Sequence, residues 1–261
     1  MQPFEFAEPK TVRDAIALLD PDDTNIRPFS GGTALMLMMK AGVMRPTRLV
    51  SLGKLGLDTI EIGPAGELRI GAMVSLRKIE TSDAVRRGWP AITRALLTLS
   101  NVRVRNVARL GGHLAHGEPH TDLPPLLSAL GAVATIAGPG GERRAPVESL
   151  YAGYLETTLA RNELIVRVDV PAMGKKRAAY LKCTTRSVDD WPAVGVAVML
   201  DGDLKTIIVS AATDKPTRLA SIDQVDQLSI ESDLHGSAAY KKQLIRVYAK
   251  RAIDEARKPA R

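Results

Sequence analysis

The sequence predicts an α+β protein in which a mixed N-terminal region is followed by a C-terminal region of sheet and helix. Three observations support this class. A strand-like run, a glycine pair and a helical pattern follow each other over residues 26–41. Three strand-like runs separated by short turns, at 178–185, 193–200 and 204–213, indicate an antiparallel meander. A helical pattern with one apolar stripe covers about 237–257.

The N-terminal region starts with a predicted helix. Thr11 and Asp14 have the spacing of a capping box, and the "DPDD" at 20–23 ends the helical pattern. The elements that follow are a strand, a tight glycine turn, a helix ended by Gly42 and a second strand, at residues 26–29, 30–32, 33–41 and 48–52. The glycines therefore lie where a strand leads into a helix, and proteins often bind phosphate at such a position.

The middle of the chain alternates between helices and strands. Apolar residues alternate on both sides of the turn at 63–67 and predict a hairpin. Residues 101–122 have no sustained period and are predicted to form a long loop of the kind that is commonly functional. A charged, glycine-containing joint at 171–177 is a predicted domain boundary. The remaining predicted elements are helices at 76–81, 91–99 and 123–130 and strands at 132–138 and 162–170.

Composition excludes several classes of protein. The net charge of +7 comes without a basic stripe interleaved with aromatic residues, which make up only 4% of the chain, so nucleic acid is not an expected partner. No apolar run reaches the length of a transmembrane helix, and the first residues do not resemble a signal peptide. The single cysteine, Cys183, excludes an internal disulfide, a thiolate zinc site and an iron–sulfur cluster held by this chain. A cytoplasmic location is expected.

Two glycine pairs, in "SGGTAL" (30–35) and "LGGHLAHGEP" (110–119), are candidates for binding phosphate. Paired glycines permit positive φ, so that successive amides can point into one concavity and hold anionic oxygens. Two such turns could each hold one phosphate of a dinucleotide, although ordinary surface turns also use paired glycines. No G-x-G-x-x-G follows the first strand and no Walker A motif occurs, which argues against a nicotinamide-binding Rossmann domain.

The second glycine pair is followed by residues that could also bind a metal. Three histidines and two carboxylates lie close together in the sequence: His113, His116, Glu118, His120 and Asp122. Zinc ligands are usually displayed from a regular frame, and the glycines and Pro119 are expected to break any helix here. We therefore expect no metal site and favour a polar loop that lines a cofactor pocket, with no catalytic acid or base on this chain.

Five ordered blocks of sequence, from about Pro3 to Arg257, resemble the FAD-binding medium subunit of the molybdenum hydroxylases, the carbon monoxide dehydrogenase and xanthine dehydrogenase family. The blocks lie at residues 28–52, 101–132, 180–198, 211–219 and 233–257. The resemblance implies a vanillyl-alcohol-oxidase (PCMH)-type FAD-binding domain over 1–172, made of two α/β subdomains at about 1–56 and 57–172. It also implies a C-terminal domain over 177–261 with a three-stranded antiparallel sheet and helices.

The same resemblance implies a set of FAD-binding residues. The glycine turns would hold the diphosphate and ribityl chain mainly with main-chain amides, Asp122 would lie near the ribityl and ring end, and Lys182 and Trp191 would line the isoalloxazine. The implied residues are Ser30, Gly31, Gly32, Thr33, Ala34, Leu35, Arg109, Leu110, Gly111, Gly112, His113, Ala115, Asp122, Lys182 and Trp191.

Three positions depart from the family pattern. Ala34 stands where the family commonly has serine, Arg109 where it has a small hydroxyl residue, and His113 where it often has asparagine or serine. Two hydroxyl donors to the cofactor are therefore missing, and a guanidinium paired with the diphosphate could offset their loss.

By resemblance, the chain would be an electron-transfer subunit. Electrons from a molybdenum cofactor on a large subunit would pass through [2Fe–2S] clusters on a small subunit to FAD on this chain, and then to an external acceptor. The complex would be a dimer of heterotrimers. Two alternatives stay open: a stand-alone FAD oxidoreductase, and a scaffold subunit of such a complex that has lost its cofactor.

Overall fold

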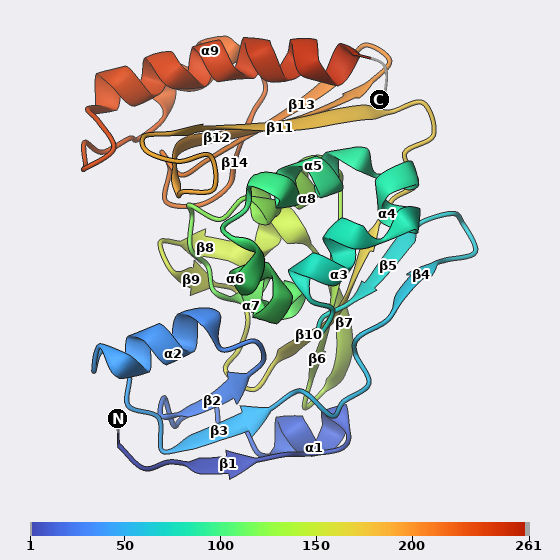
Figure 1. Cartoon of the computed structure of the whole chain (residues 1–261), viewed down its shortest axis with the longest axis vertical. Coiled ribbons are helices and arrows are strands. Elements are labelled where there is room, and N and C mark those ends of the chain that lie inside the picture. Colours follow the sequence, from blue (N-terminus) through green and yellow to red (C-terminus); the bar gives the residue numbers. More distant parts are fainter. Residues whose placement is uncertain (1, 259–261) are drawn as a thin grey trace.

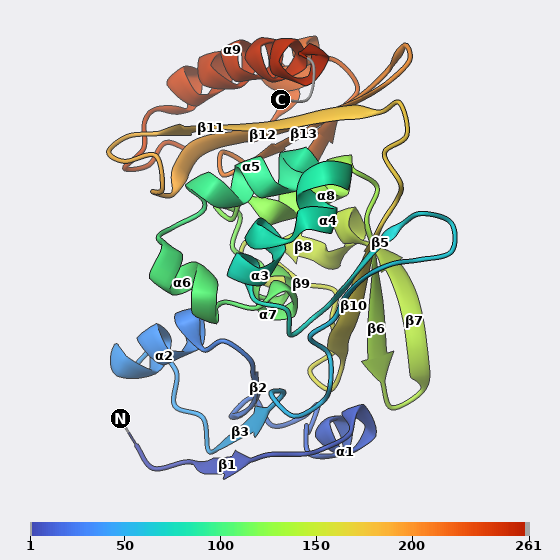
Figure 2. The same ribbon diagram turned by 45° about the vertical axis from the view of Figure 1, so that its right-hand side comes forward.

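The chain folds into three layers that follow each other in chain order (Figures 1 and 2). The computed structural model describes residues 2–258; residues 1 and 259–261, which the predicted domains include, lie outside the described residues. An N-terminal layer is followed by a middle layer of helices and sheet, and then by a C-terminal sheet. The α+β prediction is confirmed.

The N-terminal layer is a small parallel sheet with the strand order β1-β3-β2. Its central strand is its most buried one, and Val50 packs with Ala15 and Leu19 of the first helix region. That helix begins as predicted, because the Thr11 side chain accepts a hydrogen bond from the Asp14 amide. The elements are β1 (Glu5–Ala7), α1 (Val12–Ala17), β2 (Ile26–Phe29), α2 (Thr33–Lys40) and β3 (Arg48–Ser51).

The middle layer contains an antiparallel sheet with the strand order β4-β5-β10-β6-β7 and the main hydrophobic core. Its central strand is buried on both faces, as its nearly continuous apolar sequence requires. The strands are β4 (Ile60–Ile62), β5 (Leu68–Gly71), β6 (Val133–Gly138), β7 (Gly141–Pro146) and β10 (Leu164–Val170), with a separate small pair β8 (Tyr151–Gly153) and β9 (Glu156–Thr157). The helices are α3 (Leu76–Thr81), α4 (Asp83–Gly88), α5 (Pro90–Thr98), α6 (Val102–Val107), α7 (Leu110–Ala115), α8 (Leu123–Ala129) and the 3₁₀ turn η1 (Val147–Leu150).

The C-terminal layer is an antiparallel sheet between the middle helices and one long helix. One face of the sheet contacts α5 and α8, and the other is covered by α9, whose Ile245, Ala249 and Ala252 are fully buried (Figure 1). The elements are β11 (Arg177–Thr184), β12 (Pro192–Asp201), β13 (Leu204–Ser210), β14 (Thr217–Leu219), η2 (Ile222–Gln227) and α9 (Ala238–Arg257). The predicted three-strand meander is present, and β14 extends it as a short fourth strand. Among the described helices, none combines the length and the apolar character needed to cross a membrane.

The prediction of a loop over 101–122 is wrong for much of that segment. Asn101 caps α6 by accepting a hydrogen bond from the Val104 amide, and α7 follows after one turn. Gly111 and Gly112 lie inside α7 with helical backbone rather than in a turn. Glycine costs about 1 kcal/mol in a helix relative to alanine, and close tertiary packing offsets that cost here.

Candidate functional site

The two glycine pairs, about 80 residues apart in sequence, are in direct contact. An alanine Cβ at Gly31 would lie 2.3 Å from the carbonyl oxygen of Val107, just before α7. A Cβ at Gly112 would lie 2.4 Å from the Ser30 hydroxyl oxygen. A Cβ at Gly31 would force the two segments apart because it meets backbone, whereas one at Gly112 would displace the Ser30 hydroxyl. The glycines thus let the segments form one continuous wall.

The first glycine turn presents unpaired amides at the start of α2. Gly32 is the N-cap in the left-handed region (φ 69°), and no side chain caps the helix. The main-chain amides of residues 32–35 have no hydrogen-bond partner in the described part of the chain. Four free amides together with the positive end of the helix dipole form a binding site for an anion.

The second glycine pair offers less of an amide nest than the sequence predicted, since among its described bonds only the Gly112 amide has no partner. The amide of Leu110 donates to the Val74 carbonyl at 3.0 Å, and that of Gly111 donates to the Ala72 carbonyl at 2.8 Å. These amides are therefore unavailable to a ligand. Gly111 is instead required by packing, because a Cβ there would lie 2.7 Å from the Ala72 Cβ.

Both glycine pairs line one cavity of about 270 Å³ between the N-terminal and middle layers. Its walls also include Arg27 and Pro28 of β2, Leu52 directly after β3, and the start of β10. The predicted FAD-binding residues that line it are Ser30, Gly31, Gly32, Thr33, Ala34, Leu35, Arg109, Gly111, Gly112, His113 and Ala115. Leu110 is buried and is not one of the lining residues.

The cavity carries unbalanced positive charge. Neither Arg27 nor Arg109 forms an ion pair with any described carboxylate, and the buried Nε of Arg27 has no hydrogen-bond partner there. Burial lowers the pKa of Arg27, and the nearby Arg161 adds to this effect. The acidic residue in the lining, Glu163, accepts hydrogen bonds from Arg143 at 2.7 Å that lower its pKa. Its charge is therefore already balanced by a residue outside the cavity.

His113 adds a neutral polar group to the same wall. Burial, with a smaller contribution from His116, lowers the pKa of His113 to about 4, so its imidazole is uncharged near pH 7. Its buried Nε2 has no hydrogen-bond partner among the described residues. A buried polar atom without a partner is costly, and a ligand that pairs with it removes that cost.

These features fit the diphosphate of FAD. The phosphates need hydrogen-bond donors and positive charge, and the cavity offers the free amides of 32–35 and two unpaired guanidinium groups. The close approach of backbone that glycine permits is also what a diphosphate requires. The cavity volume suits the diphosphate and ribityl portion rather than the whole cofactor.

Asp122 and Lys182 lie outside this cavity and bind each other. Lys182 Nζ donates to Asp122 Oδ2 at 3.0 Å and to the carbonyls of Thr98 and Asp190 at 2.8 and 3.0 Å. The Tyr180 hydroxyl donates to Asp122 Oδ1 at 2.7 Å. Burial raises the pKa of Asp122, and the opposing effects of Lys182 and Tyr180 are smaller. All three ammonium protons of Lys182 are thus used. The bonds to Asp122 and Thr98 join the C-terminal sheet to the middle layer, and the third holds the loop between β11 and β12.

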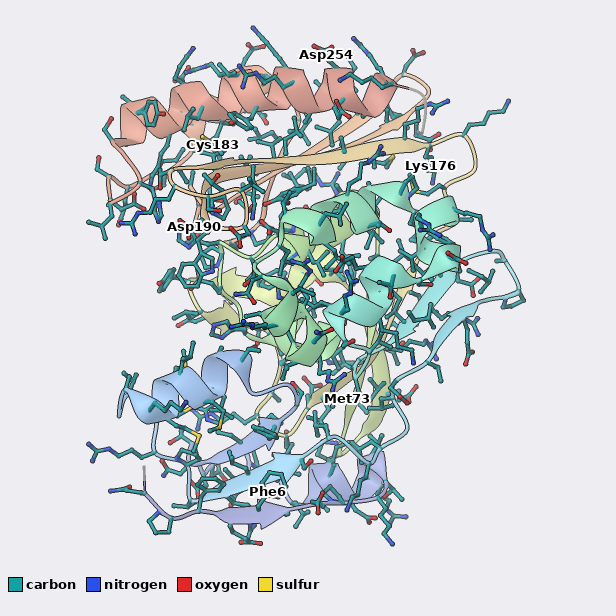
Figure 3. The ribbon with its side chains drawn as sticks, viewed as in Figure 1. Phe6, Met73, Lys176, Cys183, Asp190 and Asp254 are labelled. Atoms are coloured by element: carbon teal, nitrogen blue, oxygen red, sulfur yellow. The ribbon has the colours of Figure 1, made fainter. Side chains whose placement is uncertain are left out.

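Trp191 is 55% exposed and stacks on His120, with ring centroids 5.6 Å apart. His120 Nδ1 is 2.6 Å from Glu118 Oε1, and its buried Nε2 has no partner in the described chain. Although burial favours the neutral carboxyl, the hydrogen bonds from His120 lower the pKa of Glu118. The indole of Trp191 is therefore a surface group anchored by a histidine, not part of the core. Its neighbour Asp190 is labelled in Figure 3, on the loop that ends near the middle layer.

The histidines of this segment are not arranged as a metal site. His113 lines the cavity, whereas His120 pairs with Glu118. Within residues 2–258, no group of three or more histidine, cysteine, aspartate or glutamate side chains is placed to hold a metal ion.

Arg27 is a candidate binding residue that sequence reasoning missed. It lies in "IRPF", immediately before the first glycine turn, and its position in an otherwise apolar strand was the available signal. Met73, labelled in Figure 3 between the N-terminal and middle layers, also lines the cavity and was not predicted.

Known proteins resemble this chain along nearly its whole length. A family described as the FAD binding domain in molybdopterin dehydrogenase matches residues 2–173. The carbon monoxide dehydrogenase medium chain of Afipia carboxidovorans is 29% identical, with 99% of this chain and 98% of that protein covered.

Two solved structures have the same fold. The carbon monoxide dehydrogenase of Hydrogenophaga pseudoflava that lacks the Mo-pyranopterin moiety matches with a TM-score of 0.92 at 27% identity, covering 98% of each chain. Quinoline 2-oxidoreductase of Pseudomonas putida 86 matches with a TM-score of 0.88 at 25% identity, covering 98% of this chain and 97% of that one.

Proposed function

This chain belongs to the family of FAD-binding domains in molybdopterin dehydrogenases, and we propose that it is the electron-transfer subunit of a molybdenum hydroxylase. Like its relatives, it is a subunit of an oxidoreductase. In the proposed role, [2Fe–2S] clusters on a small subunit deliver electrons that come from a molybdenum cofactor on a large subunit, and this chain passes them to an external acceptor. The proposed assembly is a dimer of heterotrimers, and the cytoplasmic location stays a prediction.

The observation that supports this proposal most strongly is the cavity between the glycine pairs. FAD, when bound, supplies a redox centre that can accept single electrons and release them in pairs. The chain's own contribution is to bind and orient it. The free amides of residues 32–35 would hold phosphate oxygens, while Arg27 and Arg109 would balance their charge. The guanidinium of Arg109 thereby replaces the hydroxyl donor that the family usually has there.

The remaining predicted residues act around this cradle. The neutral imidazole of His113 can donate or accept one hydrogen bond at Nε2. Asp122, Lys182 and Trp191 stay proposed as ring-end residues, since they lie where the C-terminal sheet meets the segment after α7. We also propose the domain division at 171–177. The α9 side of the C-terminal sheet has a hydrophobic cluster of its own, whereas Ala178, Tyr180, Ala197 and Ile208 of that sheet pack into the middle core.

Flavin and metal content of the purified protein test this function. We expect the purified protein to show absorption bands at about 370 and 450 nm and to release FAD on denaturation. We also expect it to copurify with molybdenum and iron in the complex. Flavin without molybdenum or iron would favour a stand-alone oxidoreductase. A complex that contains both metals but no flavin on this chain would favour a scaffold subunit and contradict the proposal.

A further inference from the structure

A second cavity, of about 470 Å³, lies where the middle layer meets the C-terminal layer. Its walls come from α4 and α5, from the joint at 171–177 and from the end of α9. Figure 3 labels Lys176 on this joint and Asp254 near the end of α9. None of its lining residues belongs to the glycine-pair cavity.

The described rim of this cavity carries one carboxylate, Glu255, and six cationic side chains. The six are Arg87, Arg94, Lys175, Lys176, Arg177 and Lys258. Lys258 pairs with Glu255 at 2.6 Å, and Lys176 lies 3.8 Å from Asp201. The other four have no ion pair with any described residue.

The four unpaired cations lie on the exposed rim, where solvent screens part of their mutual repulsion. An anion in the cavity would offset the repulsion that remains. Three of the six are arginines, whose planar guanidinium groups match phosphate oxygens with paired hydrogen bonds.

The floor of the cavity is apolar. Trp89, Leu130, Ala178 and Ala256 are all buried there. The indole Nε1 of Trp89 donates to the Pro171 carbonyl at 2.8 Å, which ties the joint to the start of α5. An apolar floor under a few charged groups is the usual construction of a small-molecule site, and the volume lies within the usual range.

We propose that this cavity binds a phosphorylated small molecule of about nucleotide size. The phosphate groups contact Arg87, Arg94 and Arg177, and the uncapped start of α5 at Pro90 adds its partial positive charge. The less polar part of the ligand covers the floor. Because the walls come from both layers, the ligand holds the C-terminal layer against the middle helices. This site does not depend on flavin.

Calorimetric titration of the FAD-loaded complex with ADP tests the proposal, with pyrophosphate and adenosine as partial ligands. Loading with FAD keeps ADP out of the glycine-pair cavity. We compare the double variant Arg94→Gln/Arg177→Gln with the control Lys10→Gln/Arg13→Gln, which removes two exposed charges on and beside α1. ADP binding should weaken at least about tenfold in the first variant and stay unchanged in the control. Pyrophosphate should bind and adenosine should not.

Two results would overturn the proposal. One is ADP binding of equal strength in both double variants. The other is absence of binding to the complex. If the complex does not bind ADP but the free chain does, and the binding is lost on replacing Arg94, the cavity is covered by a partner subunit. It is then a docking surface instead.

Discussion

Replacing Gly31 by alanine separates the two glycine segments and so tests whether their contact matters. The added Cβ would lie 2.3 Å from the Val107 oxygen and 3.0 Å from the Ala108 Cα. Both atoms belong to the backbone, so the segments must part by about 0.7 Å to restore the 3.0 Å below which Cβ contacts are essentially never seen. Overpacking of this kind costs about 1–3 kcal/mol.

The same displacement moves the amides of residues 32–35, which follow Gly31 directly. We therefore expect one or two of the amide–phosphate hydrogen bonds to be lost, at about 1 kcal/mol each, which raises the FAD dissociation constant by about 5- to 30-fold. Titration of the flavin-free protein with FAD, followed by flavin fluorescence, measures this change. Urea denaturation without FAD measures the loss in the free energy of unfolding.

Gly140→Ala is a matched control, because a Cβ there meets no atom within 4 Å and the backbone does not have positive φ. Its free energy of unfolding should change by less than about 1 kcal/mol. Gly112→Ala provides a second comparison, since its Cβ would meet the rotatable Ser30 hydroxyl. Adding Ser30→Ala should relieve that clash. Equal FAD dissociation constants and equal free energies of unfolding for the Gly31 and Gly140 variants would refute the reasoning.

Three further predictions follow from the polar groups of the site. The folded pKa of His113, about 4, lies below its unfolded value of 6.5, so stability is full above pH 6.5 and falls by up to about 3 kcal/mol as the pH drops toward 4. His113→Asn should remove that part of the pH dependence of the free energy of unfolding, measured by urea denaturation. An unchanged dependence in the variant would contradict the assignment to His113. Lys182→Met leaves the buried Asp122 without its cation and should lower the free energy of unfolding by about 3–5 kcal/mol; adding Asp122→Asn should recover part of this loss, and no recovery would contradict the pairing. Arg27→Gln and Arg109→Gln should each weaken FAD binding about tenfold and reduce its salt dependence in fluorescence titrations; unchanged affinity would show that these guanidiniums do not face the diphosphate.

Local patterns predicted most of the fold because they depend on short-range physics. The capping pair at Thr11, the strand and helix around the first glycine pair and the meander after 177 all follow from periodicity and turn chemistry. Short polar strands were missed. Strand β7 is the clearest case, since it lies at the sheet edge with mostly exposed charged residues and has no apolar alternation.

The error over 101–122 has a tertiary cause. Gly111 and Gly112 lower helix propensity, and a single sequence does not show that Ala72 and Ser30 approach them closely enough to exclude a side chain. The sequence therefore identified the right residues for a contact but the wrong conformation.

The candidate site was predicted in part. The sequence identified both glycine pairs, but it could not show that segments 80 residues apart touch, or that the amides of Leu110 and Gly111 are already bonded. It also could not show that Lys182 donates its three hydrogen bonds to Asp122 and two main-chain carbonyls. Such pairings depend on how the layers stack, which no local pattern encodes.

The central claim is that the free amides at the start of α2 and the wall formed by α7 face one cavity that holds the FAD diphosphate. An experimental structure of the flavin-loaded protein tests it most directly. We predict phosphate oxygens within hydrogen-bond distance of the main-chain amides of residues 32–35, beside Arg27 or Arg109. A flavin bound elsewhere on the chain, with those amides facing only water, would contradict the account.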